Sequence, residues 1–147
     1  MYFDDLPEGY QFSTASRRLP VEAIVDFAAE WDPQPFHLDA EAAAQSPYGG
    51  IIASGFHTIL VAFRLTLEAG VWNESSMGSP GLDEIRWMMP VRPNDSLWVK
   101  AEVLSSVPSS SRPDRGRTVI IYDIYNQNEE KVATFKATHI LARKVRH

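Results

Sequence analysis

Residues 56–69 read FHTILVAFRLTLEA, and the apolar side chains of this stretch fall on every side of the helix that it predicts. Only Arg64 and Glu68 carry charge, and their i, i+4 spacing places them together. A helix that is apolar all round is expected in the middle of a protein. Gly70 is expected to end it. The stretch therefore predicts one long and fully buried helix.

On the C-terminal side of this helix the apolar pattern becomes alternating, which indicates strands. After a polar loop, strands are expected at 82–89, 96–104, 118–126 and 131–144. The polar stretch at 105–117 is interpreted as a solvated hairpin loop. The predicted fold class is α+β, with an antiparallel sheet wrapped around one long buried helix.

The predicted strand 118–126 is apolar on both faces, because both of its alternating sets of side chains are apolar. A small sheet also leaves its edge strands unpaired. A second copy of the chain would cover both features, so a homodimer or a higher homo-oligomer is expected.

The N-terminal part of the chain is expected to hold a strand at 11–18 and a helix from Pro20 to residue 31. Pro33 ends this helix. Asp39 is the expected N-cap of a short helix at 40–44, and a turn follows at 46–50.

The amino-acid composition excludes several classes of function and partner. The 147 residues are interpreted as a single domain, 1–147, with no cysteine and a net charge of −5. A negative field does not attract nucleic acid or an anionic membrane surface, so neither is expected as a partner. The absence of a long apolar run, of a signal peptide and of cysteine favours a cytoplasmic protein. A metal site is not expected, because no two of the four histidines form a tight ligand pair.

The stretch Trp31-Asp32-Pro33-Gln34-Pro35-Phe36-His37 holds the candidate catalytic residues. The two prolines prevent a continuous helix and force a sharp turn. Asp32 and His37 are therefore expected to meet around one point, where they could activate a water molecule. The alternative is a solvated aspartate in a loop and an unrelated histidine in the core.

Residues 32–37, together with 51–58, 78–87 and 90–95, resemble the MaoC-like dehydratases, a family that includes the R-specific enoyl-CoA hydratases. The resemblance implies a hotdog fold and the addition of water across, or its removal from, the 2,3 bond of an acyl-CoA-type thioester. It implies no cofactor besides the coenzyme A of the substrate. Gln34 stands where the family signature has Asn, and Phe63 or a neighbour stands where the hydratases carry a serine that holds the dyad.

In the implied reaction one of Asp32 and His37 acts as base and the other as acid, and the sequence leaves the assignment open. The helix end and apolar neighbours are expected to raise the pKa of Asp32. The N–H of Gly55 is expected to bind the thioester oxygen. The other expected substrate-binding residues are Trp31, Gln34, Phe36, Ser54 and His57.

The phosphates of coenzyme A require a local basic patch on an acidic protein. The candidates are Arg86, Arg92, Arg112, Arg115 and Arg117, and the sequence does not rank them. Two rival functions remain open at this point. One is a thioesterase of the same fold, and the other is a non-catalytic acyl-thioester binding protein.

Overall fold

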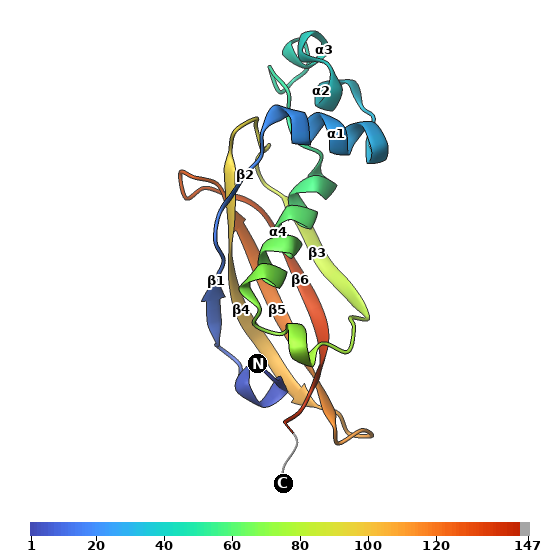
Figure 1. Cartoon of the computed structure of the whole chain (residues 1–147), viewed down its shortest axis with the longest axis vertical. Helices are drawn as coiled ribbons and strands as arrows, with labels where there is room; N and C mark the ends of the chain where they lie inside the picture. Colours follow the sequence, from blue (N-terminus) through green and yellow to red (C-terminus); the bar gives the residue numbers. More distant parts are fainter. Residues whose placement is uncertain (145–147) are drawn as a thin grey trace.

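The computed structural model describes residues 1–144, in which an antiparallel sheet curves around one long helix (Figure 1). The strand order is β1-β4-β5-β6-β3, and β2 pairs with β4 beside β1. The strands are β1 Gln11–Ser13, β2 Arg17–Arg18, β3 Gly81–Trp87, β4 Ser96–Pro108, β5 Arg115–Tyr125 and β6 Lys131–Ala142. The predicted class and architecture are confirmed.

The long helix is α4, Gly55–Ala69, and Gly70 ends it in the left-handed conformation (φ 71°) as predicted. The other helices are η1 Phe3–Asp5, α1 Val21–Trp31, α2 Pro35–Leu38, α3 Ala40–Ala44 and η2 Asn73–Ser75. None of the helices within residues 1–144 has the length and apolar character needed to cross a bilayer.

The prediction that α4 is buried on all sides is wrong for a single chain. One face packs on the sheet and is buried, namely Thr58, Ile59, Val61, Ala62, Leu65 and Thr66. The opposite face exposes Phe56, Leu60 and Phe63, with exposed fractions of 64%, 54% and 42%. Helix α4 is therefore apolar on two faces but covered on only one.

The sheet follows the predicted alternation. On β5 the buried side chains Ile120, Tyr122 and Ile124 face α4, and their neighbours Val119 and Ile121 are half-buried on the outer face. The loop predicted at 105–117 is wrong in extent, because β4 runs to Pro108 and β5 begins at Arg115. Backbone pairing with β5 extends β4 through a polar stretch whose side chains carry no strand pattern.

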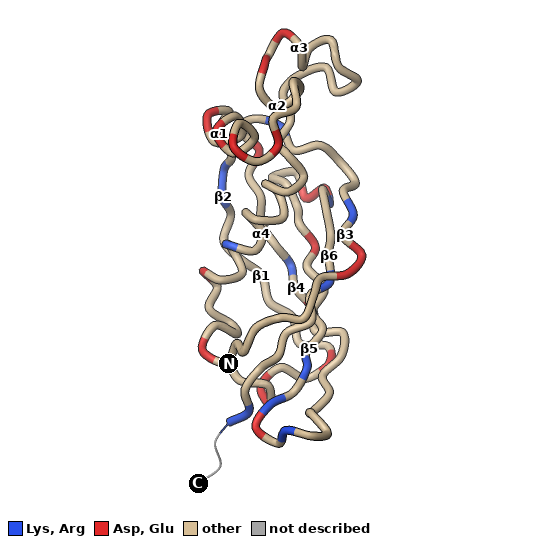
Figure 2. Tube along the Cα trace, turned by 90° about the vertical axis from the view of Figure 1, so that its right-hand side faces the viewer, with Lys and Arg blue, Asp and Glu red and all other residues tan. Residues whose placement is uncertain are grey.

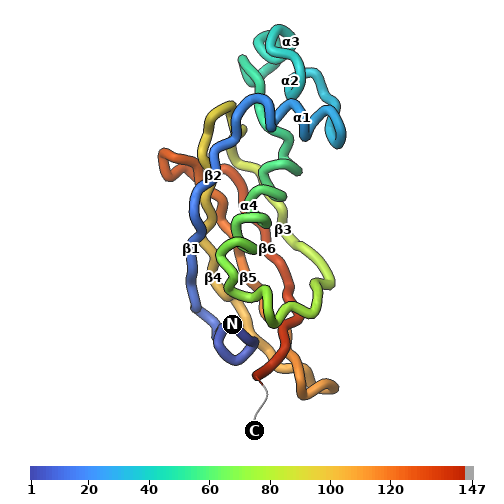
Figure 3. Tube along the Cα trace, in the orientation of Figure 1, coloured from blue at the N-terminus to red at the C-terminus, as the bar shows by residue number. Residues whose placement is uncertain are grey.

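The single strand predicted at 11–18 is two short strands, β1 and β2, which both pair with β4. Helices α1, α2 and α3 follow and cluster beyond one end of the sheet, next to the start of α4 (Figures 1 and 3). This arrangement places the 31–37 stretch over the N-terminus of α4.

Candidate active site

The backbone between α1 and α2 brings the acid and the imidazole together. The N–H of Asp32 makes the last α1 hydrogen bond, to the carbonyl of Ala28 at 2.9 Å. Pro33 has no N–H and cannot continue the helix. Pro35 then occupies the first position of α2, where its fixed φ suits a new helix. The chain reverses within this short turn, and His37 points back toward Asp32.

Asp32 and His37 form a close pair, with Nε2 of His37 3.2 Å from Oδ2 of Asp32. Their predicted convergence is confirmed. His37 is buried, and its Nδ1 lies 2.7 Å from the carbonyl oxygen of Ile52. Because a carbonyl oxygen only accepts, Nδ1 carries a hydrogen, and Nε2 is the nitrogen that faces Asp32.

Two further side chains hold the carboxylate of Asp32. Nε2 of Gln34 donates to Oδ1 at 2.6 Å, and Oγ of Ser54 donates to Oδ2 at 2.7 Å. Ser54 is fully buried and does not line the cavity, so its predicted contact with substrate is wrong. Ser54 precedes α4, whereas the family resemblance placed the serine that holds the dyad further along this helix.

The charge state of Asp32 differs from the prediction. Burial alone would raise the pKa of this carboxyl. The hydrogen bonds from Gln34 and Ser54, together with the charge and hydrogen bond of His37, outweigh burial and hold the pKa below its usual value. Asp32 is therefore a stabilised carboxylate, and the predicted upward shift is wrong.

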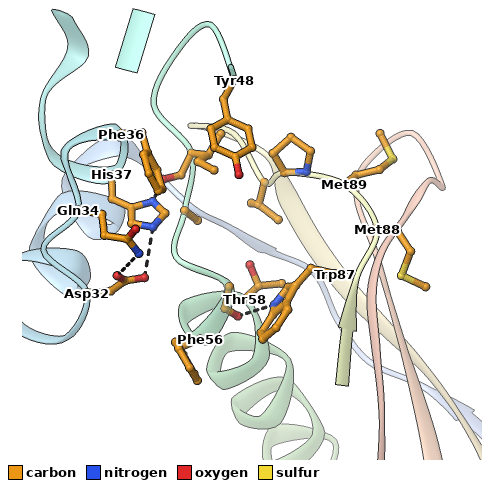
Figure 4. A pocket seen from close by; sticks show the side chains of 15 residues that line it. Asp32, Gln34, Phe36, His37, Tyr48, Phe56, Thr58, Trp87, Met88 and Met89 are labelled. Carbon is orange, nitrogen blue, oxygen red and sulfur yellow. Dashed lines mark hydrogen bonds and ion pairs between the residues drawn. The ribbon is translucent and has the colours of Figure 1, made fainter. Parts of the chain in front are cut away.

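The dyad lies in the wall of a cavity of about 520 Å³ (Figure 4). The cavity is lined by Asp32, Gln34, Phe36, His37, Tyr48, Ile52, Ala53, Gly55, Phe56, Thr58, Trp87, Met88, Met89, Pro90 and Val91. Most of these side chains are apolar, and Asp32, Gln34 and His37 lie together on one side of the cavity (Figure 4). The cavity suits a ligand with one reactive polar centre and an apolar remainder.

Gly55 lines this cavity where α4 begins, as predicted. Its carbonyl accepts a hydrogen bond from Nε1 of Trp87 at 2.9 Å. A Cβ atom at position 55 would lie 2.6 Å from the indole ring, so the close contact requires glycine. The N–H of Gly55 belongs to the first turn of α4 and has no acceptor among the described residues.

Two predicted substrate-binding residues lie elsewhere. Trp31 ends α1 with an exposed fraction of 69% and does not line the cavity. The ring of His57 does not line the cavity and stacks on Phe27 of α1 at 4.5 Å, and its Nδ1 is buried without a hydrogen-bond partner among residues 1–144. Phe36 lines the cavity as predicted and packs edge-on against His37.

Several residues that line the cavity were not predicted from the sequence. Tyr48 enters from the turn predicted at 46–50 and packs against Phe36 at 5.4 Å. Thr58 lies on α4 near Gly55, and Met88 and Met89 follow β3. Met88 and Met89 lie between the two stretches, 78–87 and 90–95, on which the family resemblance rests, so this resemblance was the signal that could have found them.

The candidate arginines do not form one patch. Arg92 lies at the rim of the cavity, where Nη2 donates to the carbonyl of Tyr48 at 2.7 Å. Arg86 is exposed on β3. Arg112, Arg115 and Arg117 line a second hollow at the β4–β5 hairpin. Among the described residues, no three histidine, aspartate or glutamate side chains gather to bind a metal ion.

A curved antiparallel sheet around a central helix, with an acid–imidazole pair at the start of that helix, defines a protein of the hotdog fold. The family model described as "MaoC like domain" matches residues 7–120, and the chain belongs to this family.

The chain is similar to the following three proteins. The structure of a MaoC-like dehydratase from Rhodospirillum rubrum is 39% identical, with a TM-score of 0.93 and 99% of both chains covered. The uncharacterised protein YdeM of Bacillus subtilis is 34% identical over 132 residues, which cover 90% of this chain and 92% of YdeM. The R-hydratase PhaJ1 from Pseudomonas aeruginosa is 22% identical, with a TM-score of 0.71 and coverage of 99% and 92%, and shares the fold.

Proposed function

We propose that this chain is a hydratase or dehydratase that adds water across, or removes it from, the 2,3 bond of an acyl-CoA-type thioester. The observation that carries the proposal is the pair of Asp32 and His37, 3.2 Å apart in the wall of an apolar cavity. Two positioned proton-transfer groups beside an apolar chamber are the parts that hydration of a conjugated bond needs. Family membership supports the same reaction class.

The charge state of Asp32 and the hydrogen bond made by Nδ1 of His37 suggest which of the two groups is the base and which is the acid. Asp32, stabilised as a carboxylate, takes a proton from the water whose oxygen bonds to carbon 3. The proposed acid is the imidazolium form of His37, which keeps its Nδ1 hydrogen on the carbonyl of Ile52 and gives the proton on Nε2 to carbon 2. Transfer of the new proton from Oδ2 to Nε2 restores the starting state. Dehydration follows the same steps in reverse.

The negative charge that develops on the thioester oxygen needs fixed donors. The N–H of Gly55 has no acceptor among the described residues and belongs to the N-terminal turn of α4, where the helix dipole favours negative charge. We assign this N–H to the thioester oxygen. The apolar walls from Phe36, Phe56 and Trp87 then receive the acyl group.

The test is a panel of 2-enoyl-CoA thioesters of increasing chain length, followed by loss of the conjugated absorbance and, in parallel, by release of free thiol. Asp32→Asn and His37→Ala should each lower kcat about 100-fold or more. The double variant should be little worse than either single variant, because the two groups act as a unit. Asp26→Asn, an exposed carboxylate of α1, is the matched control.

Three outcomes would count against the proposal. Thiol release without hydration would favour the thioesterase. Binding of acyl thioesters without turnover would favour a binding protein, although the bond from Ser54 to Asp32 speaks against an abandoned dyad. Unchanged hydration in either single variant would remove the dyad from the mechanism.

We also propose that the chain works as a homodimer. The exposed apolar side chains of α4 continue onto the edge strand β3 and the residues after it, forming one apolar surface that consists of Phe56, Leu60, Phe63, Leu82, Ile85, Trp87, Met88 and Met89. Strand β3 pairs only with β6 among the described strands. Several of these side chains also line the cavity, so a second copy on this surface would cover its mouth.

A further inference from the structure

A second hollow lies at the other end of the sheet from the dyad. It has a volume of about 210 Å³ and is lined by Ser109, Ser111, Arg112, Arg115, Gly116, Arg117 and Ile140. Figures 1 and 3 place the β4–β5 hairpin at the opposite end of the molecule from α1 and α2. Figure 2 shows several basic residues at this end of the trace, with acidic residues among them.

The strand register explains how the arginines reach one place. Arg115 and Arg117 alternate on β5 with the buried residues Gly116 and Thr118, so both arginines project from the outer face of the sheet. Ile140 pairs with Arg117 across β6 and forms the floor between the strands. The hairpin residues Ser109, Ser111 and Arg112 complete the rim.

The hairpin is held by its own hydrogen bonds. The N–H of Ser109 donates to the carbonyl of Arg115 at 3.1 Å, and the N–H of Arg112 donates to Oγ of Ser109 at 3.0 Å. The N–H of Arg143, next to the end of β6, donates to the carbonyl of Asp114 at 2.8 Å. The positions of the three arginines along the backbone are therefore fixed before any ligand arrives.

The charge at the hollow is positive although the whole chain is acidic. Asp114 accepts two hydrogen bonds from Arg115, at 2.9 and 3.1 Å, which leaves the Nη1 group of Arg115 available. Arg112 and Arg117 are exposed and form no ion pair with a carboxylate among residues 1–144. Three guanidinium groups thus face one carboxylate, and the hydroxyl group of Ser109 can still donate through its own hydrogen.

We propose that this hollow is a binding site for a phosphate-type anion. Guanidinium groups match the oxygens of phosphate in pairs, and hydroxyl groups add neutral donors at the same rim. The anion could be free phosphate or a phosphate group of a nucleotide carrier, since both present the same oxygens. The site includes neither residue of the dyad, so evidence against the proposed reaction would leave the proposed anion site unaffected, and the reverse is also true.

The test follows amide signals of the full chain by NMR in phosphate-free buffer at constant ionic strength. Inorganic phosphate and adenosine 3′,5′-bisphosphate are titrated separately, and each should give saturable shifts confined to 109–117 and the neighbouring part of β6. Arg112→Ala and Arg117→Ala should each weaken the apparent affinity about tenfold, the usual scale for a hydrogen bond to a charged group. Arg17→Ala, an exposed arginine on β2, removes the same charge elsewhere and should change nothing.

Comparison of the two ligands decides the source of the anion. Tighter binding of the bisphosphate would point to a nucleotide carrier, and equal affinities would point to free phosphate. Shifts that do not saturate, or an equal loss in Arg17→Ala, would overturn the site, because either result would mean diffuse attraction by surface charge. Thermal unfolding of each variant confirms that the fold is kept.

Discussion

At the scale of single residues, the site depends on how many donors Asp32 has. Its carboxylate accepts from Gln34 and Ser54 and also meets His37. Each of these contacts favours the charged form, and together they overcome the cost of burial. The carboxylate is thereby kept ready to accept a proton and fixed in direction at the same time.

Ser54→Ala should therefore change the pH dependence of the reaction as well as its rate. Loss of the hydroxyl removes one of the contacts that lower the pKa of Asp32, so that pKa should rise toward its usual value. If Asp32 is the base, activity is lost as pH falls through this pKa. The acid limb of the kcat profile should then move to higher pH, with kcat lowered about tenfold or more.

Ser75→Ala is the matched control for this variant. Ser75 is also a buried serine, and its hydroxyl donates to the carbonyls of Met1 and Trp72, far from the dyad. Its loss should lower the thermal midpoint without moving the pH profile of kcat. If both serine variants leave the acid limb in place, Ser54 does not tune Asp32.

The sequence predicted the meeting of Asp32 and His37 because proline chemistry is local and can be read from neighbouring residues. The positions of three side chains were predicted wrongly because they depend on contacts with distant parts of the chain. These residues are Trp31, Ser54 and His57. The direction of each side chain depends on which face of α1 or α4 meets the rest of the chain, and sequence spacing alone does not settle that.

At the scale of elements, α4 has one face whose packing holds the chain together. Leu65 lies on the buried face and is 2% exposed, whereas Leu60 lies on the outer face. Leu65→Ala should lower the free energy of unfolding by roughly 2–5 kcal/mol, as expected for a cavity in the core. The measurement is urea unfolding at several protein concentrations.

Leu60→Ala serves as the comparison on the same helix. Because Leu60 is 54% exposed in the single chain, its effect should be smaller than that of Leu65→Ala and should depend on protein concentration if a second copy covers it. Equal and concentration-independent losses in the two variants would mean that both faces are buried within one chain.

Strands β5 and β6 enclose a polar cluster inside the apolar core. Nε1 of Trp72 donates to the hydroxyl of Tyr122 at 3.1 Å, and that hydroxyl lies 2.8 Å from Nε2 of His139. Because the Tyr122 hydroxyl has no other acceptor among the described residues, its O–H donates to Nε2 of His139, and His139 is then neutral. Burial lowers the pKa of His139 to about 4.

This cluster predicts a loss of stability at mildly acid pH. In the unfolded chain histidine titrates near its ordinary pKa of about 6.5, so between that pH and about 4 the unfolded state binds the extra proton. Stability is complete above this window and should fall through it by roughly 3 kcal/mol. Urea midpoints measured across the window should fall less steeply in His139→Gln, and parallel curves for the two proteins would contradict this account.

The extent of the strands was predicted well where side chains alternate and poorly where they do not. Strand β6 has a clear alternation and was found to within two residues at its end. The last part of β4 is Ser105-Ser106-Val107-Pro108, which looks like a loop, yet it pairs with β5 across the sheet. Backbone hydrogen bonds to a well-formed neighbour extend a strand regardless of its side chains.

At the scale of the whole molecule, the apolar surface on α4 and β3 governs association. We expect a dimer by light scattering at micromolar concentration. Leu60→Asp places a charge in the centre of this surface and should shift the mass toward that of the monomer.

Val107→Asp is the control for association. Val107 is an apolar residue with an exposed fraction of 59% on β4, near the hairpin and away from the apolar surface. The Val107 variant should remain dimeric. A wild-type chain that is monomeric at these concentrations would rule out the proposed dimer, and a dimer that survives Leu60→Asp would place the interface elsewhere.

The indole of Trp87 lies so close to Gly55 that the two positions are not free to vary independently. Any side chain at 55 would displace the ring, and the carbonyl of Gly55 would then lose the indole N–H that it accepts. Substitutions at positions 55 and 87 are therefore expected to occur together among related sequences. A lineage that acquires alanine at the first residue of α4 should already have replaced the tryptophan by something smaller, and the order of the two replacements is imposed by the geometry.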